Sequence, residues 1–273
     1  MKLYLVGTPI GNLGDLSPRA LKVLEQVDFI AAEDTRVTIK LLNHFQIKKP
    51  MISYYEHNIR ERGQLIVQRI LSGEDCAIVT DAGMPCISDP GEDLVRLCAQ
   101  AGIPTEVVPG PSAVVSALAV SGLSTSRFAF EVFLSTNKKN RREHLQSIRQ
   151  DPHTLVFYEA PHKLCNTLRD MLEVLGDRRI SLVRELTKLH EEVLRLTLSQ
   201  AVAYYEQTAP KGEFVLVLEG AQPVQEAPAL TLEEAAQQVR QLQQEQGLSL
   251  PSACREIAAK TGYKKNELYE LVK

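Results

Sequence analysis

The chain has 273 residues, which is enough for two domains because one domain usually takes about 100–200 residues. Hydrophobic residues make up 44% and charged residues 24%, as is ordinary for a globular protein. The formal net charge is -3, so the surface as a whole does not attract nucleic acid. Any binding to a polyanion must therefore use local basic patches.

The sequence carries no sign of a membrane segment or of an oxidising compartment. No apolar stretch approaches the roughly 20 residues of a membrane span, and Met1-Lys2 leads straight into an apolar strand instead of a signal peptide. The five cysteines lack paired spacing, and most lie in apolar runs, which indicates reduced, buried thiols. We expect a cytoplasmic protein without a membrane partner or a bound metal.

Apolar runs and helical patterns alternate along the first 121 residues. We expect strands at residues 3–6, 29–32, 51–55, 76–79 and 105–108, and helices at 16–27, 36–45, 60–71, 93–101 and 112–120. Strands separated by helices of this length are typical of βα crossovers in a mainly parallel sheet. Residues 1–121 therefore form the expected N-terminal α/β domain.

A small, polar stretch at residues 121–125 marks the expected domain boundary. The next series predicts strands at 128–134, 154–157, 180–183, 193–196 and 214–218, and helices at 161–175 and 199–206. Neighbouring strands without a helix between them indicate antiparallel pairs, so residues 122–221 form an expected mixed α/β domain. The proline-containing stretch 223–228 predicts a linker.

Residues 229–273 form an expected helical extension. Within it, residues 253–269 predict a helix, a turn at Gly262 and a second helix that begins with Lys264 and Lys265. This is the outline of a helix-turn-helix, whose second helix contacts nucleic acid. A helical cap on the main body explains the pattern equally well, because the same segment also carries several glutamates.

The most informative segment is the loop Val79–Gly91, of sequence VTDAGMPCISDPG. It follows an apolar strand and leads into a helix, and α/β proteins bind ligands at this carboxyl edge of the sheet. Its small residues let the backbone approach a ligand, while Pro85 and Pro90 restrict its conformation. The loop therefore predicts a cofactor site.

Two other loops at the same expected edge differ in their chemistry. Residues 108–113 (VPGPSA) lead into a helix whose first amides are free, and such backbone groups suit an amphoteric ligand such as an amino-acid moiety. Residues 7–15 (GTPIGNLGD) are glycine-rich but lack both the G-x-G-x-x-G spacing and the Lys-Ser/Thr pair of a P-loop. We therefore expect no phosphate cradle at the first loop.

Charged residues follow the second expected strand at Glu33, Asp34 and Arg36. Asp34 suits the N-cap of the next helix, but capping requires neither Glu33 nor Arg36. These two residues therefore indicate the polar wall of a pocket.

The third expected strand ends in Tyr54-Tyr55-Glu56-His57-Asn58. His57 has an imidazole that titrates near neutral pH, and Glu56 adds a carboxylate. A site role and a plain surface position both remain open for this pair.

Together these segments resemble the tetrapyrrole-methylase superfamily of S-adenosylmethionine (SAM) enzymes. They resemble most its branch that methylates the ribose 2′-hydroxyl of a cytidine near the decoding centre of small-subunit (16S) ribosomal RNA. The matching segments are 7–12, 32–36, 55–58, 80–91, 109–113, 157–163, 184–192 and 211–214. The resemblance covers roughly residues 1–220 and implies two α/β domains, SAM in the cleft between them, and a homodimer.

The resemblance also implies site residues. Cofactor contacts would come from Pro9, Asp81, Ala82, Gly83, Met84, Ile87, Ser112, Ala113, Tyr158 and Gly212. The catalytic candidates are Glu33, Asp34, Arg36, Glu56, His57, Glu159 and Glu185. The sequence does not decide whether one of the carboxylates or His57 accepts the proton of the 2′-hydroxyl. Arg36 is better suited to bind a phosphate or to stabilise the conformation of its loop.

We expect RNA contact from the basic residues Lys138, Lys139, Arg141, Arg142, Arg184, Lys188, Lys264 and Lys265. A solvated helix face is the alternative for the cluster at 138–142, but a chain of negative net charge needs a local patch to hold a polyanion. Just before the cluster, residues 132–137 read VFLSTN, where the family pattern is roughly Gly-Phe-Leu-Pro-x-Lys. Either the basic contact has moved by one residue, or this loop binds its target differently.

Two other functions compete with this interpretation. A tetrapyrrole-precursor methylase or a diphthine-type protein methylase would share the family, but the charged loops at 33–36 and 55–58 and the tail argue against them. A helix-turn-helix regulator with a ligand-sensing α/β body would explain the tail. It would leave the polar loops at the strand ends without a role.

Overall fold

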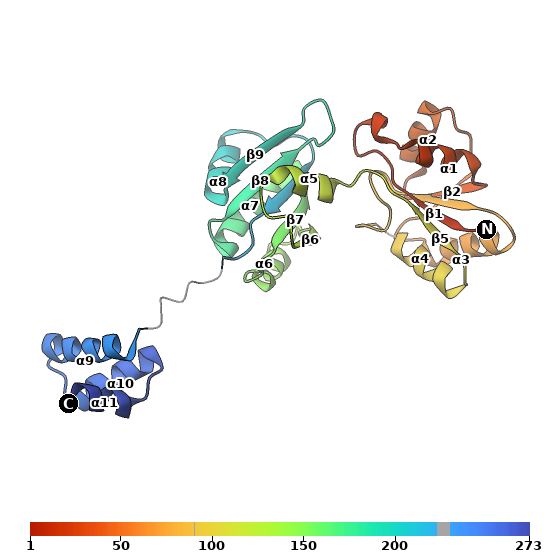
Figure 1. Cartoon of the computed structure of the whole chain (residues 1–273). Coiled ribbons are helices and arrows are strands. Elements are labelled where there is room, and N and C mark those ends of the chain that lie inside the picture. Colours follow the sequence, from red (N-terminus) through yellow and green to blue (C-terminus); the bar gives the residue numbers. More distant parts are fainter. Residues whose placement is uncertain (90, 223–229) are drawn as a thin grey trace. The chain divides into compact units, whose positions relative to one another are not determined.

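The computed structural model describes residues 1–89, 91–222 and 230–273. The chain divides into two compact units, Met1–Ala221 and Gln222–Lys273, whose elements are labelled in Figure 1. The linker predicted at residues 223–228 lies outside the described residues.

The first sheet contains the five strands that we expected in the first part of the chain, all parallel, in the order β3-β2-β4-β1-β5. The strands are β1 (Leu3–Val6), β2 (Phe29–Ala32), β3 (Met51–Ser53), β4 (Cys76–Val79) and β5 (Thr105–Val108). The connecting segments contain η1 (Leu13–Asp15), α1 (Pro18–Gln26), α2 (Thr35–His44), α3 (Ile59–Leu71) and α4 (Gly91–Gln100). The predicted parallel sheet is thus confirmed.

Helices cover both faces of this sheet, with α1 and α2 on one side and α3 and α4 on the other (Figure 1). Because side chains alternate along a strand, Ile30 and Ala32 of β2 join the core under α1 and α2. Phe29 and Ala31 of the same strand join the core under α3 and α4. A strand buried on both faces is apolar along its whole length, which is why β2 and β4 were easy to predict.

The second sheet is mixed, as expected, with the strand order β6-β7-β10-β8-β9. Its strands are β6 (Phe128–Phe133), β7 (Thr154–Glu159), β8 (Arg179–Arg184), β9 (Glu192–Thr197) and β10 (Phe214–Leu218). Strand β6 runs parallel to β7, and the other neighbours are antiparallel. Helices α6 (Lys138–Ser147), α7 (Pro161–Leu175) and α8 (Leu198–Gln207) supply the apolar side chains of one face.

Helix α5 (Ala113–Ser121) packs on the opposite face of the second sheet. Its buried Val114, Ala117 and Leu118 contact valines of β7, β8 and β10. The expected boundary at residues 121/122 would leave this helix with the first sheet. We propose instead that the chain passes from one domain to the other at residues 109–112. Helix α5 then begins directly after the loop that follows β5.

The second unit contains α9 (Leu232–Gln246), α10 (Leu250–Thr261) and α11 (Lys265–Val272). They enclose a small core that includes Val239, Ile257 and Leu268. Gly262 ends α10 in a left-handed conformation with φ of 77°, so the predicted helix, turn and second helix are present. Among the described residues, no helix is long and apolar enough to cross a membrane.

Candidate active site

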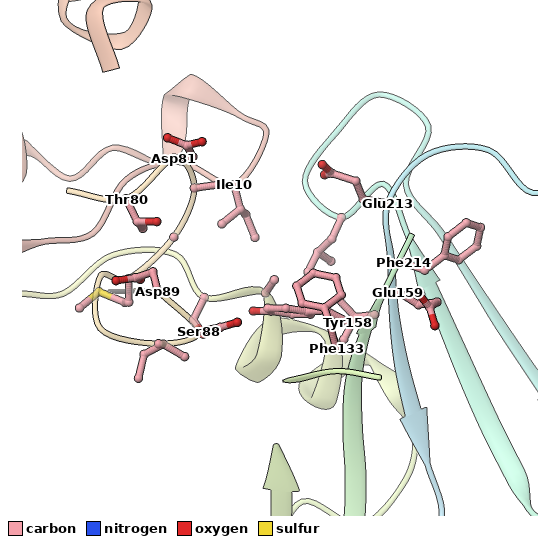
Figure 2. A pocket seen from close by; sticks show the side chains of 18 of the residues that line it. Ile10, Thr80, Asp81, Ser88, Asp89, Phe133, Tyr158, Glu159, Glu213 and Phe214 are labelled. Atoms are coloured by element: carbon pink, nitrogen blue, oxygen red, sulfur yellow. The ribbon is translucent and has the colours of Figure 1, made fainter. Parts of the chain in front are cut away.

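A cleft of about 540 Å³ lies at the carboxyl edge of the first sheet, and the second sheet supplies its other wall (Figure 2). This volume lies within the roughly 300–1,000 Å³ of typical small-molecule sites. The first wall consists of Ile10, Glu33, Thr80, Asp81, Ala82, Gly83, Met84, Ile87, Ser88, Asp89, Ser112 and Ala113. The second consists of Phe133, Tyr158, Glu159, Ala160, Pro161, Val183, Leu186, Glu213, Phe214 and Val215.

Backbone contacts hold the loops of the first wall together. Thr8 and Gly83 exchange two backbone hydrogen bonds, at 2.9 and 3.2 Å. A Cβ at Gly7 would lie 2.7 Å from the backbone of Gly110 and from the sulfur of Met84, so only glycine permits this approach. The loops after β1, β4 and β5 therefore form one connected surface.

The loop after β4 carries backbone strain and an unpaired carboxylate oxygen. Cys86 and Ser88 both have φ of 71°, a conformation that costs energy in residues other than glycine. Asp89 Oδ1 accepts from the backbone N–H groups of Cys86 and Gly91 at 2.9 Å, whereas Oδ2 is buried without a partner among the described residues. Burial raises the pKa of Asp89, and the two N–H donors oppose that rise.

Glu33 lines the cleft, and two groups that follow β4 fix its position. Its Oε2 accepts from the hydroxyl of Thr80 at 2.5 Å and from the backbone N–H of Asp81 at 3.3 Å. Burial raises the pKa of the Asp81 carboxyl, and the neighbouring Glu33 carboxylate raises it further. These two acidic groups thus lie close together on the polar side of the cleft.

Asp34 and Arg36 form an exposed ion pair just outside the lining. Arg36 donates to Asp34 from Nη2 at 2.6 Å, and 88% of its side chain remains exposed. The side-chain donation from Arg36, followed by its backbone N–H, lowers the pKa of Asp34 to about 2. Asp34 is therefore a weak proton acceptor, and it holds the Arg36 guanidinium in a fixed direction.

The second wall is mostly aromatic and aliphatic. The ring of Tyr158 lies 4.9 Å from that of Phe130 and 5.4 Å from that of Phe133, between centroids. Burial raises the pKa of Tyr158, and the backbone N–H of Val114 opposes this by bonding to the phenol oxygen. The Tyr158 hydroxyl thus lies at the first turn of α5, next to Ser112 and Ala113 of the opposite wall.

Glu159 and Glu185 are both engaged in hydrogen bonds. Glu159 is buried, and it accepts from the Ala160 N–H at 2.9 Å and from the Thr167 hydroxyl at 2.5 Å. Glu185 Oε1 accepts from the Glu213 N–H and from Lys188 Nζ, each at 2.9 Å. These bonds, the backbone one foremost, lower the pKa of Glu185. Both carboxylates stabilise loops here.

Gly212 lies beneath Glu185, since a Cβ there would come within 2.6 Å of the Glu185 side chain. Its φ of 85° also favours glycine. Gly212 and Pro9 are not lining residues themselves, but their neighbours Glu213 and Ile10 are. The other eight residues expected to contact the cofactor all line the cleft.

Glu56 and His57 lie away from this lining, exposed in the turn after β3. The ring of His57 packs edge-on against Tyr55 at 6.0 Å. Neither side chain is among the lining residues of the cleft. The geometry therefore favours the plain surface position that the sequence left open.

The phosphate role expected of Arg141 is wrong. Its side chain is 7% exposed and forms an ion pair with the buried Asp170 at 2.5 Å. The same guanidinium donates to the carbonyl groups of Ser135 and Thr136 at 3.1 and 3.3 Å. Four of the five guanidinium N–H groups thus have partners within the protein, and the side chain is buried from any RNA phosphate.

The other basic residues differ in their freedom. Lys138 and Lys139 are exposed at the start of α6, where Lys139 lies 3.9 Å from Glu143. Arg142 pairs with Glu173 and lies 3.8 Å from Asp170. Arg184 pairs with Glu192 at 3.0 Å and Lys188 with Glu213 at 2.8 Å. Lys264 and Lys265 begin α11 in the helical unit.

Sequence reasoning missed several cleft residues. Thr80, Ser88 and Asp89 belong to the loop that we singled out, yet none was assigned a role. Phe133 belongs to the family pattern around the loop at 132–137, and that pattern was the available signal. Ile10 and Leu186 belong to the matching segments 7–12 and 184–192, but Val183 and Val215 carry no sequence signal, because aliphatic lining residues look like ordinary core.

The chain matches the family of tetrapyrrole (corrin/porphyrin) methylases over residues 2–202. Among solved structures, diphthine synthase has a TM-score of 0.61 at 14% identity, over 80% of this chain and 90% of that one. Uroporphyrin-III-C-methyltransferase from Thermus thermophilus has a TM-score of 0.55 at 21% identity, over 79% of this chain and 93% of that one. At these identities the likeness establishes the fold alone.

Curated relatives named ribosomal RNA small subunit methyltransferase I are much more similar. The Synechocystis sp. protein is 48% identical over 98% of this chain and 96% of its own length. The Vibrio cholerae protein is 43% identical over 98% of this chain and 93% of its own length. The Thermotoga maritima protein is 51% identical over 80% of this chain and 98% of its own length. By both the family match and these relatives, the chain belongs to the tetrapyrrole methylase family.

Proposed function

We propose that the protein transfers a methyl group from SAM to the ribose 2′-hydroxyl of a cytidine in small-subunit (16S) ribosomal RNA. One observation carries this proposal: 48% identity over 98% of the chain to a relative named ribosomal RNA small subunit methyltransferase I. That identity far exceeds the 14% and 21% to the solved methylases that share the fold.

The cleft fits SAM in size and chemistry. Its volume of about 540 Å³ suits a ligand of this size. The acidic group of Asp81 suits the ammonium of the amino-acid moiety, and the Ala113 N–H at the start of α5 suits its carboxylate. When bound, SAM would supply an electrophilic methyl group, which would form a bond to the ribose oxygen as its bond to sulfur breaks and S-adenosylhomocysteine leaves.

Alignment of the two reactants lowers the barrier of such a reaction more than proton acceptance does. Holding them in position contributes roughly 7–11 kcal/mol, whereas a placed base adds about 10²–10⁴-fold in rate. Of the candidate bases, Glu33 combines a cleft position with an oxygen, Oε1, that accepts no hydrogen bond from the described residues. We assign proton acceptance from the 2′-hydroxyl to Glu33, oriented by Thr80.

The RNA backbone requires cations outside the cleft. Lys138 and Lys139 are exposed, and they lie directly after the strand and loop that form the second wall. Arg36 presents a guanidinium that Asp34 already orients, which suits a phosphate oxygen. We propose that these three residues hold phosphates on either side of the target nucleotide.

A homodimer is the usual assembly of the family that the sequence resembles, and we propose it for this chain. On helix α5, Val115 is 57% exposed and Val120 is 36% exposed, so both are available to a partner. The mass in solution by light scattering tests the assembly, and a monomer at micromolar concentration would contradict it.

The function is tested with small subunits that lack the modification. Subunits are incubated with methyl-labelled SAM, and the RNA is then digested to nucleosides for mass spectrometry. We expect label in 2′-O-methylcytidine alone. Label in a base-methylated nucleoside would refute the ribose target, and transfer to uroporphyrinogen but not to RNA would indicate the tetrapyrrole alternative.

A further inference from the structure

Phe133, at the end of β6, is an aromatic side chain that lines the cleft and yet stays 51% exposed. Other large side chains of the second sheet, such as Phe157 and Phe214, are almost fully buried. An exposed ring inside a cleft leaves an apolar surface in contact with water, which burial against a ligand would remove.

A local irregularity in the strand directs this ring. The β6–β7 register shifts between Phe130 and Phe133, and such a bulge re-aims the side chain beside it. Val132 within the bulge has φ of 58°, which is a costly conformation for a β-branched residue. Strain of this kind persists where the surrounding structure enforces it.

The enforcing contact comes from Arg141. Its Nη1 donates to the carbonyl groups of Ser135 and Thr136, directly after Phe133 and Leu134. Its other nitrogens donate to the buried Asp170 at 2.5 and 2.8 Å. Arg141 thus ties the loop after β6 to α7, which makes it a positioning residue for the ring.

Two further groups flank the ring. Tyr158 lies 5.4 Å away between ring centroids, at an interplanar angle of 58°. Lys163 Nζ lies 5.5 Å from the Phe133 centroid, a distance at which a cation is attracted to the π-face. Figure 2 shows Phe133 and Tyr158 on the second wall of the pocket, opposite Ser88 and Asp89.

We propose that Phe133 is the stacking surface for the nucleobase of the target nucleotide. This inference rests on the proposed function, in which the ribose of the target nucleotide enters the cleft. Proteins that recognise single-stranded RNA hold its unstacked bases on aromatic side chains. A pyrimidine ring beside Phe133 places its sugar inside the cleft, near the first wall.

The role of Phe133 is tested with substitutions that separate the effect of its aromatic face from that of its apolar volume. Phe133→Leu keeps apolar volume but removes the π-face, and we expect kcat/KM for small subunits to fall about 5- to 150-fold. The Kd for SAM, measured by calorimetry, should stay within about twofold. Phe133→Tyr should retain activity. Phe128→Leu is the matched control, because Phe128 is 42% exposed on the same strand but does not line the cleft.

A direct readout uses the absence of tryptophan from the chain. In Phe133→Trp, the single indole should be quenched by small-subunit RNA when S-adenosylhomocysteine is present, and in Phe128→Trp it should not. Wild-type kcat/KM for Phe133→Leu would overturn the inference. So would a SAM Kd that rises by the same factor as kcat/KM falls, since the ring would then contact the cofactor. Wild-type enzyme without transfer to small subunits would instead refute the proposed function, and the inference with it.

Discussion

The two walls of the cleft differ in the chemical groups that they present to a ligand. The first wall consists of short loops with small residues, main-chain groups and the carboxylates of Glu33, Asp81 and Asp89. The second presents rings and aliphatic side chains, among them Phe133 and Tyr158. A wall of hydrogen-bonding groups recognises a charged, amphoteric ligand, and an apolar wall recognises planar surfaces. The contrast assigns the methyl donor's polar groups and the proton transfer to the first wall and the target base to the second.

The largest expected effect concerns the first wall. Glu33→Gln keeps the shape of the side chain but removes the proton acceptor, so kcat should fall about 10²–10⁴-fold. The Kd for SAM should change little. Rates from single-turnover assays and Kd values from calorimetry measure the two effects separately. Glu56→Gln is the control, because Glu56 is exposed away from the cleft, and a comparable loss in that variant would contradict the assignment.

The next effect concerns the support of the second wall. Arg141→Leu removes the main partner of buried Asp170 and leaves only Arg142 Nη1, 3.8 Å away, which should cost up to about 3–5 kcal/mol of unfolding free energy in urea melts. Arg142→Leu removes the exposed pair with Glu173 and only the longer, 3.8 Å contact with Asp170, so it should cost clearly less, about 1 kcal/mol. Equal losses in both variants would show that Arg141 does not hold the loop after β6.

A smaller effect separates RNA binding from cofactor binding. Lys138→Glu combined with Lys139→Glu should weaken binding to small-subunit RNA. The slope of the logarithm of the binding constant against the logarithm of salt concentration should become about 1.4 less steep, as expected for the loss of two phosphate contacts on a single strand. The SAM Kd should not change. The same net charge change at exposed Lys22 on α1 and exposed Lys48 after α2 serves as control. An unaltered salt slope would remove α6 from the RNA surface.

The smallest effect is a pH dependence of stability. The Glu213 N–H and then Lys188 lower the pKa of Glu185 from its ordinary value of 4.5. A lowered folded-state pKa stabilises the fold above the unfolded-state value, and the stabilisation is lost as pH falls through the folded-state pKa. Glu185→Gln should therefore lower the melting temperature at pH 7. The difference in melting temperature between this variant and the wild type should become smaller in acid. Exposed Glu25 provides the control as Glu25→Gln, and a difference that does not vary with pH would contradict the account.

The sequence predicted the first wall far better than the second. Strands β2 and β4 are short apolar runs that end in polar loops, so their positions and their common sheet edge follow from local pattern. Helix α5 was harder to place, because it is apolar around most of its circumference and no single face indicates which sheet it covers. Its partners on β7, β8 and β10 lie far along the chain.

The second wall depends on contacts that local pattern does not contain. Arg141 looked like one cation in a basic run, and only its pairing with Asp170, 29 residues later, shows that it is buried. Phe133 looked like an ordinary strand residue, because the shift in register that exposes its ring is a property of the paired strands. Long-range pairing therefore decides which side chains between positions 128 and 142 face the cleft.

A crystal structure with S-adenosylhomocysteine tests the central claim most directly. The account predicts the amino-acid moiety on the main-chain atoms of residues 81–84 and 112–114, with Phe133 left uncovered by the nucleoside. A nucleoside bound outside the cleft, or an adenine stacked on Phe133, would contradict this division between the two walls.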